Sequence, residues 1–147
     1  MQSLLQCAYA WIACFAFCII FQMRGKSMLF APLGGALGWG VYLLAGASFS
    51  DLFAYFLATL AISSYAEGMA RWQKVPVTGY LLVALLPLVP GGGIYYTMEY
   101  CINGQTSLFL ETGLHTFGIA GALAIGVLLV SSVVRLWHVV HVERTRV

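Results

Sequence analysis

The chain has 147 residues, of which 61% are hydrophobic and 8% are charged, and its mean hydropathy is +0.90. A soluble domain carries about a quarter of its residues as charged side chains. This composition therefore excludes a water-soluble protein and predicts that most of the surface faces the lipid bilayer. The net charge of +2 comes from scattered residues and gives no indication of a nucleic-acid partner. We expect one transmembrane domain over residues 1–147.

Five stretches are apolar enough to cross a bilayer, which takes about 20 residues each. They cover residues 3–21, 28–47, 52–70, 79–98 and 113–138. The first stretch has no basic residue before it, so we expect a retained span and not a cleaved signal peptide. Its Cys7, Cys14 and Cys18 are expected to pack as small apolar side chains. The fold class predicted is an all-α integral membrane protein with about five transmembrane helices.

Small residues recur every four positions in the second and fifth stretches. Gly34 and Gly38 form a GxxxG pattern, and Gly118, Ala122 and Gly126 repeat the same spacing near the other end of the chain. Such faces let helix backbones approach closely. The pattern predicts helix packing, either within this chain or against a partner subunit.

Glu67 is the acidic residue that lies within a predicted span, in the third stretch. An ionisable residue in a span is costly and suggests a function, here the coupling of transport to a proton or another ion. The alternative is structural. Arg71 follows Glu67 by four residues, and this order and spacing form a stabilising pair on a helix.

The fourth stretch contains Pro87 and Pro90, followed by Gly91, Gly92 and Gly93. These residues disfavour a continuous helix, and they lie near the bilayer midplane. Irregular backbone at that depth must be buried or line a cavity. A second half-helix would point its unpaired N–H groups at the break and could bind a substrate carboxylate there, with Tyr95, Tyr96 and Thr97 as further donors. The alternative is a packing kink without a ligand.

Basic residues stay on the cytoplasmic side of a membrane. All of them lie in the first loop, the third loop or the C-terminal region: Arg24, Lys26, Arg71, Lys74, Arg135, Arg144 and Arg146. The second and fourth loops carry Asp51, Glu99 and Glu111 instead. With five spans, this division predicts an N-terminus outside and a C-terminus in the cytoplasm.

No residue pattern indicates an enzyme, a metal site or a cofactor. The histidines, His115, His138 and His141, do not come in sets of three or four converging ligands. HExxH, GxSxG, P-loop and GxGxxG motifs do not occur in the chain. We therefore expect no catalytic residue, no metal and no cofactor.

Three segments resemble the threonine/serine exporter family (ThrE-like), in its short form that corresponds to the C-terminal membrane half. They are residues 34–39 in the second stretch, Glu67 with Arg71 and Pro76 around the third loop, and Pro87 to Tyr95 in the fourth stretch. The Pro-x-x-Pro-Gly segment followed by Tyr is the most specific of them. The resemblance covers nearly the whole chain in order.

The resemblance implies a multi-pass protein of the bacterial inner membrane that exports threonine and serine, or dicarboxylates such as succinate. It also implies a partner, a second membrane half that carries a cytoplasmic domain. Glu67 and residues 87–95 are the positions where it places functional interest. The alternative function is a membrane scaffold or assembly subunit whose broken fourth helix only packs.

Overall fold

The computed structural model describes the backbone of residues 2–144 and the side chains of residues 3–137; Arg146 lies outside the described residues. Residues 2–144 form six α-helices and one short 3-10 helix, without a strand, and the prediction of an all-α protein is confirmed. The helices are α1 (Gln2–Ile20), α2 (Ser27–Gly46), α3 (Asp51–Gln73), α4 (Val77–Leu85), η1 (Leu86–Leu88), α5 (Gly91–Ile102) and α6 (Thr106–Arg144).

Four of these helices, α1, α2, α3 and α6, are long and apolar enough to cross a membrane. Residues 77–88 and 91–102 meet the same criterion only as a pair, bent by 54° at the break between them. The described chain thus has four spans, or five when the bent pair counts as one. This number agrees with the prediction of about five spans, and the protein is a multi-pass membrane protein.

The turns between helices follow from local backbone chemistry. Lys74 ends α3 in a left-handed conformation, and Pro76 then begins the next segment. Gly104 has a φ of 70° in the turn between α5 and α6, a conformation that glycine adopts without strain. These residues terminate their helices within one turn, so the connections are short.

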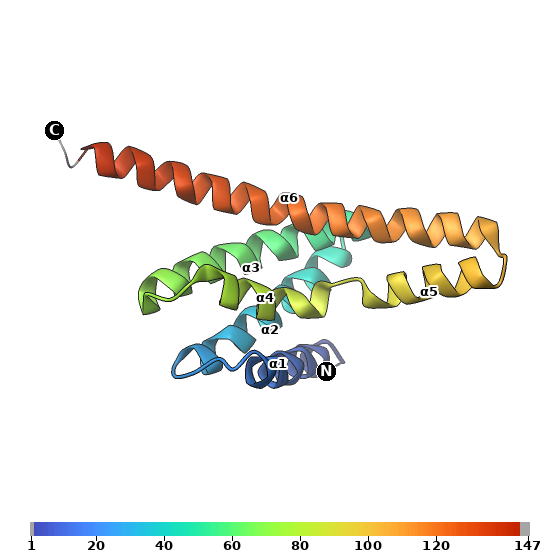
Figure 1. The fold of residues 1–147 in the computed structure, drawn as a ribbon, viewed down its shortest axis with the longest axis horizontal. Helices are drawn as coiled ribbons and strands as arrows, with labels where there is room; N and C mark the ends of the chain where they lie inside the picture. Colours follow the sequence, from blue (N-terminus) through green and yellow to red (C-terminus); the bar gives the residue numbers. More distant parts are fainter. Residues whose placement is uncertain (1, 145–147) are drawn as a thin grey trace.

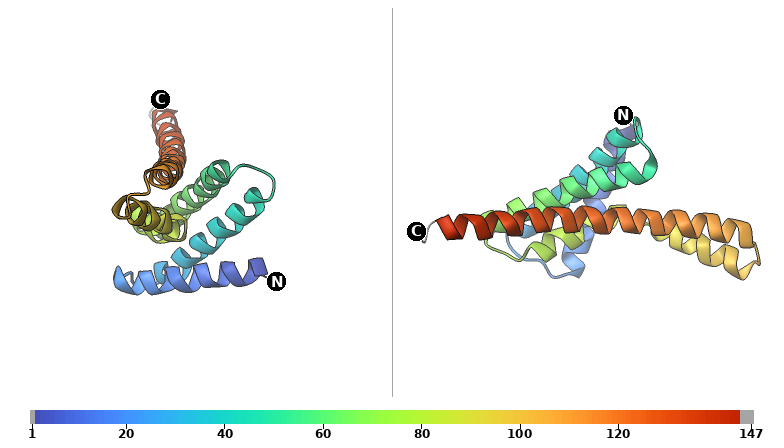
Figure 2. Two further views of the ribbon diagram at one scale, coloured as in Figure 1. Left: turned by 90° about the vertical axis from the view of Figure 1, so that its right-hand side faces the viewer. Right: turned by 90° about the horizontal axis from the view of Figure 1, so that it is seen from above.

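The N-terminal helices form a bundle around small residues. α2 packs against α1 and α3, α4 packs against α2 and α3, and α6 lies along α3 (Figures 1 and 2). The buried side chains there include Ala31, Ala58, Ala66, Tyr80 and Leu88. Small side chains at these contacts allow close approach of the helix axes.

The α5–α6 hairpin extends from one end of the bundle (Figure 1). α6 has 39 residues, which at 1.5 Å per residue is about 58 Å, well beyond the thickness of a bilayer's hydrocarbon core. It begins at Thr106, seven residues before the stretch predicted from hydropathy. Part of this extra length lies beside α5, because Phe109 lines one cavity together with Ile94 and Met98 of α5. No residue of α5 is buried within this chain.

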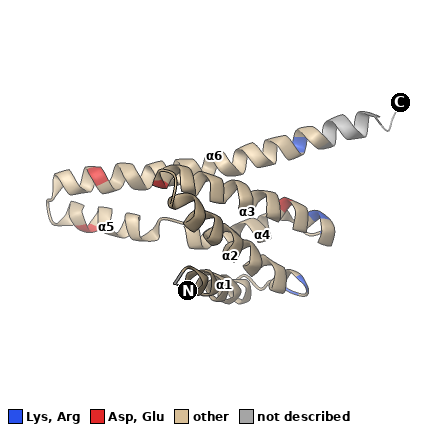
Figure 3. Cartoon of the chain, turned by 180° about the vertical axis from the view of Figure 1, so that it is seen from behind, with Lys and Arg blue, Asp and Glu red and all other residues tan. Residues whose placement is uncertain are grey.

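Charged residues separate along the long axis of the molecule. In Figure 3 the Lys and Arg positions gather at one end, and most of the acidic positions lie toward the other end. The loop of Arg24 and Lys26 and the end of α3 with Arg71 form part of the basic end. The three-dimensional arrangement therefore keeps the separation that the sequence shows in its loops.

Candidate functional site

The break between α4 and α5 is the first candidate site. Val89 and Pro90 separate η1 from α5, and α5 begins at Gly91. The N–H group of Gly91 donates to the carbonyl of Val89 at 2.7 Å, and that of Ile94 donates to the carbonyl of Pro90 at 3.1 Å. The N–H groups of Gly92 and Gly93 belong to the first turn of α5, whose donors have no acceptor within their own helix. The positive end of the α5 dipole therefore lies at the break.

An open cavity of about 590 Å³ adjoins this break, between α5 and α6. Its lining is almost entirely apolar and includes Pro90, Ile94, Met98, Phe109 and Phe117. The hydroxyls of Thr97 and Thr116 also line it, but each donates to a carbonyl of its own helix at 2.7 Å. A ligand at the break would therefore be bound mainly by the backbone N–H groups at the start of α5.

The structure brings together only part of the residue set predicted for the break. Pro90 and Thr97 line the cavity. Tyr95 lies on another side of α5, beside Met98 and Glu99, and Tyr96 packs against Tyr95 at 5.4 Å between ring centroids. Pro87 belongs to η1, near Gly35 of α2. Neither tyrosine lines this cavity.

The three glycines of the break differ in their surroundings. A Cβ atom added at Gly91 or Gly92 would meet no atom within 4 Å, whereas one added at Gly93 would collide with Thr116 of α6. Gly93 is thus a packing position in this chain. Gly91 and Gly92 leave the approach to the α5 N-terminus open.

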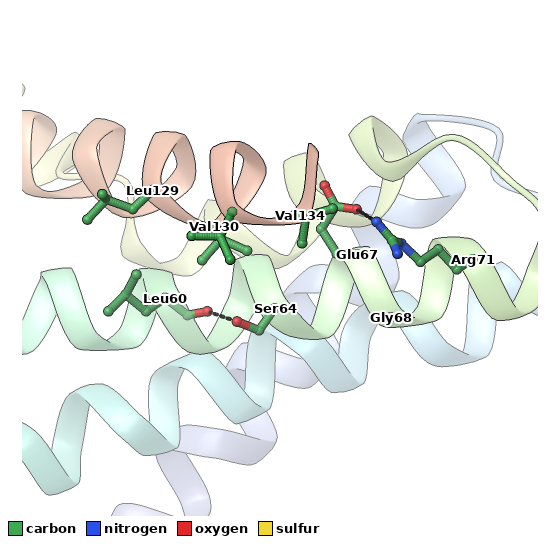
Figure 4. A pocket seen from close by; sticks show the side chains of 9 residues that line it. Leu60, Ser64, Glu67, Gly68, Arg71, Leu129, Val130 and Val134 are labelled. Atoms are coloured by element: carbon green, nitrogen blue, oxygen red, sulfur yellow. Dashed lines mark hydrogen bonds and ion pairs between the residues drawn. The ribbon is translucent and has the colours of Figure 1, made fainter. Parts of the chain in front are cut away.

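The second candidate site is a cleft between α3 and α6 that surrounds Glu67 and Arg71 (Figure 4). It has a volume of about 410 Å³. From α3 it is lined by Leu60, Ser64, Glu67, Gly68 and Arg71, and from α6 by Leu129, Val130, Val133 and Val134. We call this hollow the Glu67 cleft. It places two opposite charges and a hydroxyl against an apolar wall.

Glu67 and Arg71 form a loose ion pair in this cleft. Their closest atoms, Oε2 and Nη2, are 3.7 Å apart, which is longer than a hydrogen bond. The Glu67 side chain is 15% exposed and that of Arg71 is 42% exposed. The sequence predicted this pair from its spacing. It did not reveal Ser64 or the α6 wall, because their proximity depends on α6 packing beside α3.

A third polar cluster joins three helices at the acidic end. The Tyr42 hydroxyl of α2 donates to Oδ1 of Asp51 at 2.9 Å, and His115 Nε2 of α6 lies 3.2 Å from Oδ2 of the same carboxylate. No spacing in the sequence indicates that these three residues meet. Their common feature was a location near ends of predicted spans on the same side of the membrane.

The small-residue pattern lies at helix contacts within this chain. An added Cβ at Gly34 would meet Tyr65 and Ala84, and one at Gly38 would collide with Ile62. On α6, Gly118 faces Leu52 and Gly126 faces Thr59, while Ala122 between them is half-buried. In the part of the chain that the structure describes, no group of three His, Cys, Asp or Glu side chains is placed to hold a metal ion.

A multi-pass helical membrane protein with a helix pair bent at a Pro-Gly break, and with open cavities between its helices, has features found in transport proteins. Residues 6–133 match the family model described as "Threonine/Serine exporter, ThrE". The chain therefore belongs to the threonine/serine exporter family, and the resemblance noted in its sequence is confirmed. No solved structure matches the chain.

Proposed function

We propose that this chain is one membrane subunit of a two-component exporter in the bacterial inner membrane. Together with a second membrane half, it forms the exporter of threonine and serine. The observation that carries the proposal is the broken α4–α5 span beside a cavity. Broken spans of this kind place helix ends at substrate sites in transporters.

The break is the proposed site for the substrate carboxylate. Gly93 packs against Thr116, next to the His115 that contacts Asp51, so the first N–H groups of α5 lie level with the α2–α3 turn and need water or a ligand as acceptor. A carboxylate satisfies them well, because hydrogen bonds to a charged acceptor are stronger than neutral ones. Gly91 and Gly92 leave space for such an anion to approach.

The orientation proposed places the basic end in the cytoplasm and the N-terminus outside. Its support is the separation of charges in the loops and along the molecule. In this orientation, the Glu67 cleft opens near the cytoplasmic end, and the Tyr42–Asp51–His115 cluster lies toward the outside.

The exposed hairpin supports the proposal of a partner half. α5 buries no residue within this chain, and Ile94, Met98 and Ile102 expose more than half of their side-chain surface. Lipid can cover such residues, but a site at the interface of two repeats needs both halves. We propose that the second half packs along α5 and completes the cavity at the break.

Export from intact cells tests this function. Cells that lack the chain should retain threonine and serine, and a plasmid copy should restore their release into the medium. Succinate measured in the same samples distinguishes a dicarboxylate exporter from an amino-acid exporter. If neither amino acid nor succinate responds to the chain, a scaffold function replaces transport.

A further inference from the structure

The Glu67 carboxylate lies in surroundings that leave it incompletely paired. Its side chain is largely covered, and across the cleft it faces the apolar side chains Val130 and Val134. Arg71 is its ion-pair partner, at a distance longer than a hydrogen bond. The described residues provide no hydrogen bond to this carboxylate. A largely covered carboxylate is stabilised by any further donor that a ligand brings.

Arg71 has donors that remain available to a ligand. A guanidinium carries five N–H donors, and the described hydrogen bonds include none from Arg71. Its side chain is partly exposed at the mouth of the cleft (Figure 4). The cleft therefore presents a carboxylate and a guanidinium that share one long ion pair, with space between α3 and α6 for a ligand.

We propose that the Glu67 cleft binds the backbone end of a zwitterionic amino acid, with its ammonium on Glu67 and its carboxylate on Arg71, as the cytoplasmic entry site of the exporter. The entry role and the choice of amino acids rest on the function proposed above. Ammonium and carboxylate are carried by the same carbon of an amino acid, and the two side chains that would bind them lie 3.7 Å apart. Arginine also binds carboxylates through two parallel hydrogen bonds.

The rest of the cleft fits a small hydroxylated side chain. The Ser64 hydroxyl lies one turn from Glu67 and donates to the Leu60 carbonyl at 2.8 Å, so its oxygen remains free to accept a hydrogen bond from the ligand. The valines of α6 supply contacts for a methyl group. The volume of about 410 Å³ lies within the range of small-molecule sites, about 300–1,000 Å³.

The same charges disfavour a dicarboxylate. One carboxylate of succinate could bind Arg71, but the second would lie in a cleft that already contains the Glu67 carboxylate. Like charges brought together in this way reject the wrong ligand. The cleft thus selects amino acids over dicarboxylates. It is separate from the break cavity, because the two cavities share no lining residue.

Ligand binding to the full-length chain in lipid nanodiscs, with the subunit that co-purifies with it, tests this inference. The ligands are threonine, N-acetylthreonine, threonine methyl ester and succinate. Wild type should bind threonine at least tenfold more tightly than the other three. Glu67→Gln should weaken threonine binding at least tenfold and remove the disadvantage of N-acetylthreonine. Arg71→Gln should also weaken threonine binding at least tenfold, and it should remove the disadvantage of threonine methyl ester.

Two further variants separate binding from folding. Gly68→Leu places a side chain in the cleft where an added Cβ meets no atom within 4 Å, so it should abolish binding at normal protein abundance. Glu111→Gln, at an exposed acid on α6, is the matched control and should leave binding unchanged.

The proposal is overturned if wild type does not bind threonine, or if folded Glu67→Gln, Arg71→Gln and Gly68→Leu proteins keep wild-type affinity and selectivity. If binding depends on these residues but cells export no amino acid, the cleft assignment stands and the exporter function fails.

Discussion

At Gly34, the backbone of α2 comes close to two neighbouring helices. An added Cβ would lie 2.9 Å from Cδ1 of Tyr65 and 3.1 Å from Cβ of Ala84. The Tyr65 ring cannot easily move away, because its hydroxyl donates to the Phe30 carbonyl at 2.8 Å. The close approach of these helices therefore requires glycine at this position.

Gly34→Leu should lower the free energy of unfolding by about 1–3 kcal/mol, because it overpacks this contact. Thermal unfolding of the purified protein in detergent measures the change. Gly121→Leu on the exposed side of α6 is the control, since its added Cβ meets nothing within 4 Å. Equal shifts for the two variants would contradict the packing described.

Tyr42→Phe removes the hydrogen bond that connects α2 to Asp51 at the start of α3. The expected loss of stability is about 0.5–1 kcal/mol, toward the low end for a hydrogen bond because this one is exposed. Thermal unfolding reads out this change too, and Tyr9→Phe, at an exposed tyrosine of α1, serves as the control. A wild-type unfolding temperature for Tyr42→Phe would show that the bond contributes nothing.

At the scale of elements, leucine variants at the break between α4 and α5 can distinguish a loss of function from a loss of folding. Gly92→Leu should abolish export while abundance stays normal, because its side chain enters open space at the α5 N-terminus. Gly93→Leu should lower abundance as well, because it collides with Thr116. Immunoblots of membranes and threonine release from the same cells measure both effects. Normal export by Gly92→Leu would show that the break is a packing kink and not a substrate site.

Local chemistry explains which elements could be predicted. Two prolines and three glycines act on their own backbone, so the interruption at Pro90 could be read from the sequence. The early start of α6 could not, because residues 106–112 are more polar than the span that follows and become helical alongside α5. Contacts between residues of different helices could not be predicted from the sequence either. The spacing of Glu67 and Arg71 was visible, but the α6 valines that share their cleft lie more than 60 residues after Glu67 in the sequence.

For the whole molecule, the native cysteines offer a direct test of orientation. Cys101 is exposed near the end of α5, whereas Cys14 and Cys18 are buried. A membrane-impermeant maleimide should label Cys101 in intact spheroplasts, and Cys101→Ser should remove that label. Lys26→Cys, introduced together with Cys101→Ser, should react only after the membrane is opened. Labelling at position 26 in intact spheroplasts would reverse the orientation.

The most direct test of the central claim is efflux of labelled threonine from liposomes that contain the purified chain, with or without its second half. We predict efflux when both halves are present and none with this chain alone, because a site at a repeat interface needs both halves. Efflux by the chain alone at the rate of the pair would contradict the two-component account, and no efflux from the pair would contradict export itself.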